Sequence, residues 1–343
     1  MTDPSLPSRA TLPTVRFGRT GMDITRVGFG AWAIGGAGWS FSWSHQDDGA
    51  SVEAIRHAIA RGVNWIDTAA VYGLGHSEEI VARALRDIPA ADRPYVFTKC
   101  GLVWDERDRQ APPRRIGNPA SIRRELDASL RRLNVERIDL YQMHWPAEDG
   151  TPIEEYWQAL LDLKKAGKVR AVGLSNHDAA QLEAAARVGQ VDTLQPPFSA
   201  IHRDAAVSIL PWCHAHDTGV IVYSPMQSGL LSGAFTAERA ASLPADDWRS
   251  RVPDFTGDGL RRNLALADAL RPIAARHRTS VGAVAIAWTL AWPGVTGAIV
   301  GARSAAQVDG WIAAASLTLS GLDLEEIALA INQTGAGTWG RVK

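Results

Sequence analysis

Short apolar runs alternate with longer amphipathic segments along most of the chain. Eight of these runs are rich in β-branched and aromatic side chains, which favours buried strands. We predict strands at residues 27–30, 63–66, 95–98, 138–143, 169–174, 193–195, 220–223 and 297–300. Segments with a helical period predict helices at residues 49–61, 77–85, 121–133, 153–166, 178–187, 205–217, 259–276 and 304–315.

This alternation predicts an α/β fold. Parallel strands need helical crossovers, and eight strand–helix units over 343 residues favour closure into a (β/α)8 TIM barrel. Two short segments at residues 15–17 and 22–24 flank a Gly-Arg-Thr-Gly turn and predict a β-hairpin before the barrel. Because no linker or shift in composition divides the chain, we predict one barrel domain over residues 14–343 after a flexible tail at residues 1–13.

Two connections at the carboxyl ends of the predicted strands are long. They span residues 101–120, after the third strand, and residues 224–258, after the seventh. Loops of this length on the carboxyl face of a barrel usually shape substrate access or cover a cofactor. We therefore expect the specificity of any site on this face to depend on them.

Composition limits the expected binding partners and the expected cellular compartment of the protein. The formal net charge is −1 and no basic stripe is present, so we expect no nucleic-acid partner. Residues 280–302 carry no charge, but a Trp-Pro-Gly break at residues 292–294 favours a buried helix at 281–290 and a strand over a membrane span. With two cysteines and no apolar leader, we expect a cytoplasmic protein; its oligomeric state stays open.

Four residues able to move or orient a proton stand at or just past the ends of apolar runs: Asp67, Tyr72, Lys99 and His144. Each alone is more commonly structural, as a helix cap, a solvated charge or a core histidine. On successive strands of one barrel, however, all four would converge at the carboxyl face. Lys99, held by Asp67, would lower the pKa of Tyr72 and ease proton donation, while His144 orients a substrate oxygen.

The chain resembles the aldo-keto reductases, in particular bacterial members of the general-stress and inositol-operon type. The resemblance runs from about residue 16 to residue 315 and rests on Asp-Thr-Ala-Ala-Val-Tyr at 67–72, Thr-Lys at 98–99, Met-His-Trp-Pro at 143–146, Gly-Leu-Ser-Asn at 173–176 and Tyr-Ser-Pro at 223–225. It implies a barrel that reduces aldehydes or ketones with NADPH, NADH being possible. It also implies that Asp67, Tyr72, Lys99 and His144 form a catalytic tetrad with Tyr72 as the proton donor.

Residues at the ends of the later strands are assigned to the cofactor. Amides and hydroxyls can pair with a nicotinamide carboxamide, an aromatic ring can stack on the nicotinamide, and the turn that opens the last helix suits a 2′-phosphate. The assigned residues are Ser175, Asn176, Gln195, Tyr223, Ser224, Pro225, Gly229, Leu231, Gly301 and Arg303, with Gln307 as the adenine contact that the resemblance implies. Two positions on the adenosine and phosphate side, Trp311 and Ala234, differ from the Asn and Lys of many relatives.

The thirteen tryptophans divide by position. Those within strands and helices, such as Trp65, Trp157 and Trp288, fit the core. Trp32, Trp104 and Trp145 lie at or beyond strand ends, and we expect them to line a pocket for an apolar or sugar-like small-molecule carbonyl substrate.

Two groups of charged or metal-ligating residues are interpreted without a functional role. His214 and His216 are two apart on a predicted helix and so face different sides, which argues against a metal site. The pair Glu78 and Glu79 is interpreted as a solvated helix face.

Two other functions remain open at this point. Some barrels of the resembled family are nucleotide-sensing subunits of channels, with bound cofactor and slow catalysis. A metal-dependent barrel hydrolase would need clustered His and carboxylate ligands, and only Asp67 and His144 stand at suitable strand ends. We therefore predict no metal.

Overall fold

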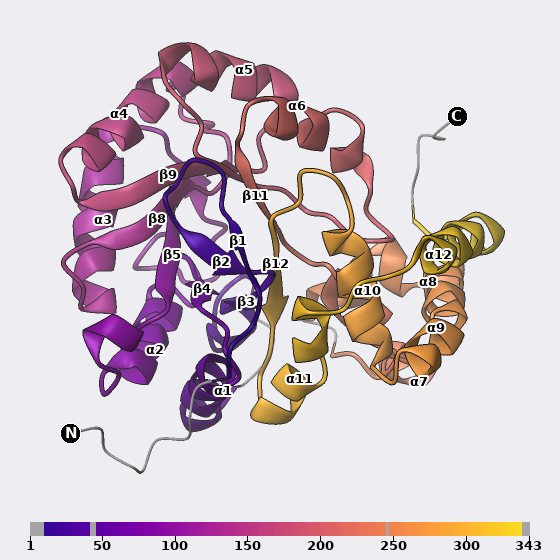
Figure 1. Cartoon of the computed structure of the whole chain (residues 1–343). Helices are drawn as coiled ribbons and strands as arrows, with labels where there is room; N and C mark the ends of the chain where they lie inside the picture. The colour runs from indigo at the N-terminus through magenta and orange to yellow at the C-terminus, as the bar shows by residue number, and fades with distance from the viewer. Residues whose placement is uncertain (1–9, 42–45, 245–246, 338–343) are drawn as a thin grey trace.

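Eight parallel strands close into one barrel in the computed structural model, which describes residues 10–41, 46–244 and 247–337 (Figure 1). Their order around the barrel follows the chain, and the last strand pairs with the first. The strands are β3 (Val27–Gly30), β4 (Trp65–Asp67), β5 (Tyr95–Cys100), β8 (Ile138–Met143), β9 (Val169–Ser175), β10 (Thr193–Gln195), β11 (Gly219–Val222) and β12 (Gly297–Gly301). The predicted (β/α)8 barrel is confirmed.

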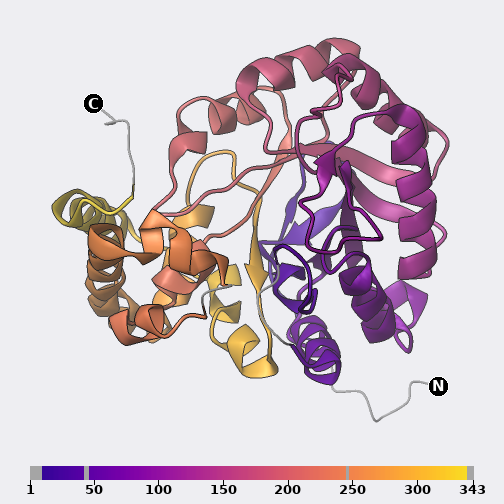
Figure 2. The same ribbon diagram turned by 180° about the vertical axis from the view of Figure 1, so that it is seen from behind.

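Helices surround the barrel (Figures 1 and 2), and they bury their apolar faces in the core, some against the strands and others against neighbouring helices. They are α1 (Asp48–Ala60), α2 (His76–Leu85), α3 (Pro119–Leu133), α4 (Ile153–Lys165), α5 (Ala179–Val188), α6 (Ile209–Ala215), α8 (Gly257–Ala269), α9 (Arg271–Arg276), α10 (Val281–Leu290), α11 (Ala305–Asp309) and α12 (Gly321–Thr334). Every residue of α10 is buried, as predicted for core. Within the described residues, no helix is long and apolar enough to cross a membrane.

The last part of the chain departs from the predicted helices. Three of them are divided, because a proline or glycine interrupts a regular helix. The divisions fall near Pro211, giving η3 (Asp204–Ala206) and α6, at Pro272, giving α8 and α9, and at Gly310, giving α11 and η7 (Ile312–Ala315). Helix α12 was not predicted, although a capping box of Ser320 and Asp323 marks its start.

The predicted hairpin is present and lies across the amino-terminal end of the barrel (Figure 1). It consists of β1 (Thr14–Arg16) and β2 (Asp23–Thr25). Phe17, beside the turn, stacks on Phe97 of the barrel with ring centroids 5.9 Å apart, and the centroid of the Trp65 ring lies 5.3 Å from that of Phe97. The Trp65 indole Nε1 donates a hydrogen bond to the Thr25 carbonyl at 2.8 Å. This end of the barrel is therefore filled by fully buried aromatic rings.

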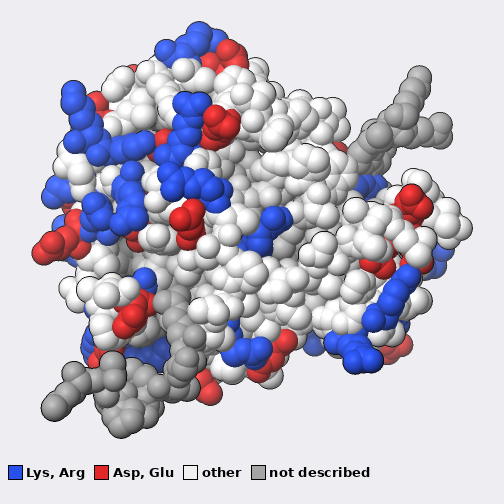
Figure 3. Space-filling view, viewed as in Figure 1, with Lys and Arg blue, Asp and Glu red and all other residues white. Residues whose placement is uncertain are grey.

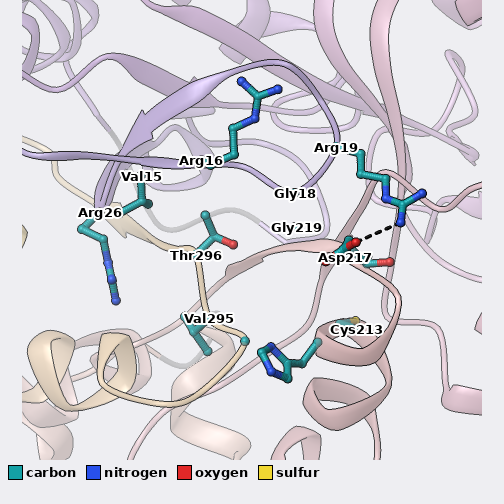
Figure 4. A pocket seen from close by; sticks show the side chains of 13 residues that line it. Val15, Arg16, Gly18, Arg19, Arg26, Cys213, Asp217, Gly219, Val295 and Thr296 are labelled. Carbon is teal, nitrogen blue, oxygen red and sulfur yellow. Dashed lines mark hydrogen bonds and ion pairs between the residues drawn. The ribbon is translucent and has the colours of Figure 1, made fainter.

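The outer surface at this end is charged but mixed. Lys and Arg side chains gather over α3 and α4 with Asp and Glu among them, whereas the surface beside α10 is mostly uncharged (Figure 3). An open cavity of 470 Å³ lies between the hairpin and the strand ends, and Arg19 forms an ion pair with Asp217 there at 2.9 Å (Figure 4). This cavity is at the end of the barrel opposite to the four predicted catalytic residues.

The predicted flexible tail at residues 1–13 lies largely outside the described residues. Of the part that is described, the Ala10 amide donates a hydrogen bond to the Ala60 carbonyl at 3.1 Å, and Leu12 packs against the core. Ala10 and Leu12 therefore lie against the folded domain.

The two long connections lie on the face turned away from the hairpin (Figure 2). The first carries a small antiparallel pair, β6 (Leu102–Val103) and β7 (Arg114–Arg115). The second carries short helices, namely η4 (Gln227–Ser232), α7 (Ala237–Ala241), η5 (Trp248–Arg251) and η6 (Pro253–Phe255). Both connections contribute to the large cavity described next.

Candidate active site

The four predicted catalytic residues meet at the carboxyl end of the barrel. Asp67 ends β4 and Lys99 lies near the end of β5, each two residues beyond an aromatic ring of the barrel interior, so the pleat points both side chains inward. The Lys99 Nζ lies 2.6 Å from the Asp67 Oδ2 and donates a hydrogen bond to the Tyr72 hydroxyl at 3.5 Å. The ring of His144, directly after β8, meets the Tyr72 ring edge-on with centroids 5.6 Å apart.

Burial dominates the acid–base properties of these groups. It raises the pKa of Asp67 and lowers that of Lys99, while the 2.6 Å ion pair opposes both changes. Burial, together with the charge of Lys99, also holds the pKa of His144 well below its usual value. His144 is therefore neutral at physiological pH, and its imidazole can donate one hydrogen bond.

The expected effect of Lys99 on Tyr72 was wrong. Burial of the phenol and the negative charge of Asp67 raise the pKa of Tyr72 well above its usual value. With Lys99 held against Asp67 at 2.6 Å, the charge of Lys99 does not outweigh these two effects on the pKa. Tyr72 therefore keeps its proton throughout the physiological pH range.

A second set of polar groups lies across the barrel from Tyr72, where β9, β10 and β11 end. Gln195 Nε2 donates to the Asp67 Oδ1 at 2.9 Å, which links this set to the tetrad. Ser175 Oγ donates to the Gln195 carbonyl at 2.8 Å, and the Tyr223 hydroxyl donates to the Asn176 Oδ1 at 2.7 Å. Amides and hydroxyls held in this way can pair with a carboxamide.

Backbone strain is concentrated beside this set. Asn176, Ser224 and Ser228 have φ angles of 62°, 57° and 51°, which non-glycine residues rarely adopt. All three line the large cavity. Strained residues cluster at functional sites because the surrounding structure holds them in place.

One cavity of 910 Å³ joins the tetrad, this amide set and the turn after β12. Its size is typical of pockets for cofactors and small ligands. Predicted site residues on its wall are Trp32, Asp67, Tyr72, His144, Trp145, Ser175, Asn176, Gln195, Tyr223, Ser224, Pro225, Gly229, Gly301, Arg303 and Gln307.

Three predicted site residues are not on that wall. Lys99 is fully buried behind Asp67 and Tyr72. Leu231 is buried in the core of the second long connection. Trp104 packs beneath the guanidinium of Arg132, whose carbon lies 5.9 Å from the ring centroid. The sequence marked Trp104 as a loop aromatic but could not show which way its ring faces.

Three arginines lie close to one another on the cavity wall, beside the turn that follows β12. Arg239, Arg249 and Arg303 all line it, and burial together with the charges of the other two lowers the pKa of Arg303. Asp247 holds Arg249 through two hydrogen bonds of 3.0 and 2.7 Å. Gln307 accepts a hydrogen bond from the Arg303 amide at 2.7 Å. Such clustered guanidinium groups suit a phosphate.

Aromatic rings form the remaining wall. Trp32 stacks between Tyr72, at 6.3 Å, and Trp248, at 6.0 Å. Trp145 packs against Arg115, with the guanidinium carbon 4.5 Å from the ring centroid. An apolar part of a small ligand beside Tyr72 would meet these surfaces.

Several wall residues were not predicted. They are Trp39 and Phe41, which follow β3, Arg115 of β7, Arg239 of α7 and Arg249 of η5. The only signal in the sequence was the length of the connections that carry three of them.

Among the described residues, no group of three or more His, Cys, Asp or Glu side chains could hold a metal ion. A barrel with a buried phenol, a lysine–carboxylate pair and a neutral imidazole beside a cavity of cofactor size instead fits the oxidoreductases that work on carbonyl groups.

Comparison with known proteins shows which family the chain resembles. The model of the aldo/keto reductase family matches residues 26–331. The aldo-keto reductase YhdN of Bacillus subtilis is 34% identical over 316 residues, which is 92% of each chain. The NADH-specific methylglyoxal reductase of Escherichia coli is 33% identical over 333 residues, 93% of this chain and 99% of that one. The solved glycerol dehydrogenase of Gluconobacter oxydans superposes with a TM-score of 0.86 at 37% identity, covering 96% and 98% of the two chains.

The chain therefore belongs to the aldo/keto reductase family. It is an oxidoreductase of the class that acts on carbonyl groups with a nicotinamide cofactor.

Proposed function

We propose that this protein reduces small aldehydes and ketones to alcohols with NADPH, and that Tyr72 donates the proton. The observation that carries the proposal is the position of the Tyr72 hydroxyl. It lies 3.5 Å from Lys99 Nζ and beside the His144 ring, on the wall of the 910 Å³ cavity. A substrate oxygen placed there can meet a phenol and an imidazole together.

The residues of the chain divide the acid–base work. Tyr72 holds its proton at neutral pH because its pKa is raised, and an alkoxide forming on the substrate is basic enough to take it. Lys99 donates a hydrogen bond to the same phenol oxygen and stabilises the phenolate as it forms. Asp67 holds Lys99 in place, while neutral His144 donates to the substrate oxygen and orients it.

The cavity also fits a dinucleotide. A bound reduced nicotinamide would supply the hydride. Ser175, Asn176 and Gln195 would hold its carboxamide, and Tyr223 would lie against the ring. At the far end Arg303 would hold the adenosine 2′-phosphate, which favours NADPH over NADH, and Gln307 would contact the adenine. The relative from Escherichia coli is named as NADH-specific, so this preference needs its own test.

The substitution Tyr72→Phe tests the reaction. It removes the hydroxyl and keeps the ring that packs on Trp32, so we expect kcat to fall about a thousandfold. Affinity for NADPH, measured by fluorescence titration, should stay within about twofold. Oxidation of NADPH is followed over a panel of aldehydes, ketoses and pyridoxal.

The matched control is Tyr95→Phe, at the other end of the barrel, which should retain wild-type turnover. Turnover by Tyr72→Phe at the wild-type rate would refute the assignment. Tight NADPH binding by the wild type with negligible turnover of every carbonyl tested would instead favour a nucleotide-sensing barrel.

A further inference from the structure

The first turn of α2 contains a fully buried carboxylate outside the barrel wall. The sequence interpretation of Glu78 as solvated was wrong, because this side chain has no exposed surface. Its Oε1 accepts a hydrogen bond from the Thr98 hydroxyl at 2.6 Å, and its Oε2 lies 2.6 Å from the Arg132 Nε of α3. A buried charge is costly unless it is paired in this way.

Thr98 connects this carboxylate to the catalytic lysine. Along β5 the side chains alternate, so Phe97 and Lys99 point into the barrel and Thr98 points out toward α2. Glu78 and Lys99 thus lie on opposite sides of the same strand. The 2.6 Å bond to Thr98 fixes the backbone that carries Lys99.

Ser77, the residue before Glu78, forms hydrogen bonds with the ends of neighbouring strands. Ser77 Oγ donates to the Ala31 carbonyl at 3.0 Å and lies 2.9 Å from the Thr68 hydroxyl. The Ser77 amide donates to the Tyr72 carbonyl at 3.1 Å. One turn of helix therefore fastens the ends of β3, β4 and β5 and the loop that carries the phenol.

Gly75 allows this arrangement. It precedes α2 with a φ of 103°, and a Cβ there would lie 2.9 Å from the Arg132 Cδ. Glycine at this position lets Arg132 pass beneath the helix end to reach Glu78.

We propose that Glu78, held by Thr98 and Arg132, is a positioning residue of the active site, which fixes β5 from behind the barrel wall and places a negative charge across the strand from Lys99. Glu78 makes no direct hydrogen bond with Lys99 among the described residues. The proposal rests on the proposed function, because it assumes that Lys99 acts through Tyr72.

The pH dependence expected for Lys99 depends on four neighbouring ionisable groups. Asp67 and Tyr72 face it from β4 and the following loop, His144 faces it from the end of β8, and Glu78 lies across the strand. The charge of Glu78 raises the pKa of Lys99 against the effect of burial. Removal of that charge lowers the pKa, so the ammonium is lost at a lower pH than in the wild type.

Two ionisable groups on neighbouring elements face Glu78. Arg132 of α3 is the cation that compensates it. Burial, with the charge of Glu78 as one of the smaller causes, raises the pKa of Tyr141 of β8, so this phenol stays neutral. Lys99 is therefore the group whose titration reports the loss of Glu78.

The test is Glu78→Gln in the full chain with NADPH and an aldehyde that the wild type reduces. We expect kcat to fall about tenfold while KM for aldehyde and cofactor stays within about twofold. The alkaline limb of the kcat profile should move to lower pH by roughly half a unit or more. The control is Glu79→Gln, on the same turn with its side chain 60% exposed, which should match the wild type.

Two results would overturn the proposal. One is a Glu78→Gln enzyme with wild-type kcat and pH profile. The other is a uniform loss of activity with an unmoved alkaline limb, which a purely structural role would give. Melting temperatures are measured alongside.

If Glu78→Gln does not fold, Thr98→Val and Thr98→Ser replace it. Only the serine variant keeps the hydroxyl that binds Glu78, so it should retain a kcat closer to the wild type than the valine variant. Equal losses in the two would refute the role of this hydrogen bond. Retained activity in Tyr72→Phe would refute the proposed function itself. If Tyr72→Phe is inactive but the Glu78 and Thr98 variants are as active as the wild type, only the positioning role is overturned.

Discussion

The two ends of the barrel interior are built from the same strands with opposite chemistry. On β4 the inward side chain changes from Trp65 to Asp67 within two residues, and on β5 it changes from Phe97 to Lys99. The aromatic pair packs under the hairpin with no charge, while the charged pair is equally buried, with Asp67 on the cavity wall and Lys99 directly behind it.

This difference separates stability from chemistry along a single strand. Burial of aromatic rings stabilises the fold by about 2 kcal/mol or more per ring. Burial of an ion pair is close to neutral at best, because desolvation offsets the attraction. The carboxyl end therefore depends on the amino end for its stability, and variants at the two ends should affect different measurements.

The largest effect on stability is expected at the amino end for Gly28→Ala. A Cβ at Gly28 would lie 2.2 Å from the ring of Trp65, which the fully packed end cannot accommodate. We expect a loss of about 3 kcal/mol in the free energy of unfolding, measured by urea denaturation.

The control for that variant is Gly321→Ala at the start of α12, where an added Cβ meets nothing within 4 Å. It should leave stability unchanged or raise it slightly. A Gly28→Ala protein as stable as the wild type would show that the amino end is more loosely packed than the described contacts indicate.

A smaller effect, on affinity instead of stability, is expected at the carboxyl end for Arg303→Ala. If Arg303 holds the 2′-phosphate, the dissociation constant for NADPH should rise about tenfold to thirtyfold, and that for NADH should change little. Titration of both cofactors measures this ratio. Arg86→Ala, an exposed arginine after α2, is the control. Equal weakening of the two cofactors would assign Arg303 to a part of the dinucleotide that they share.

The same contrast explains what could be predicted from the sequence. The strands, and the meeting of the four residues at their carboxyl ends, were predictable because strand ends are marked locally, by an apolar run followed by Asp67, Lys99 or His144. The burial of Glu78 was not, because Glu78 and Glu79 look alike in sequence and only packing against α3 and β5 distinguishes them. The direction of the Tyr72 pKa shift also depended on burial, which no sequence pattern gives.

The smallest effect is expected for Glu125→Gln, behind the first long connection at the carboxyl end. Glu125 Oε2 accepts a hydrogen bond from the Gly101 amide at 2.8 Å, and burial raises the pKa of Glu125 from 4.5 to about 7. Since the folded state then binds more protons than the unfolded state between pH 4.5 and 7, stability falls as pH rises through this window. The glutamine variant lacks this dependence and can still accept the bond.

Urea denaturation at pH 5 and pH 8 measures the difference. The variant should gain about 1 kcal/mol relative to the wild type on going to the higher pH, after allowance for partial solvent screening of Glu125. Asp127→Asn, exposed on the same helix, should show no such gain. A gain would show that the carboxyl end holds a buried acid at a cost to stability, as the comparison of the two ends requires. The absence of a gain would mean that the hydrogen bonds to Glu125 fully offset its burial.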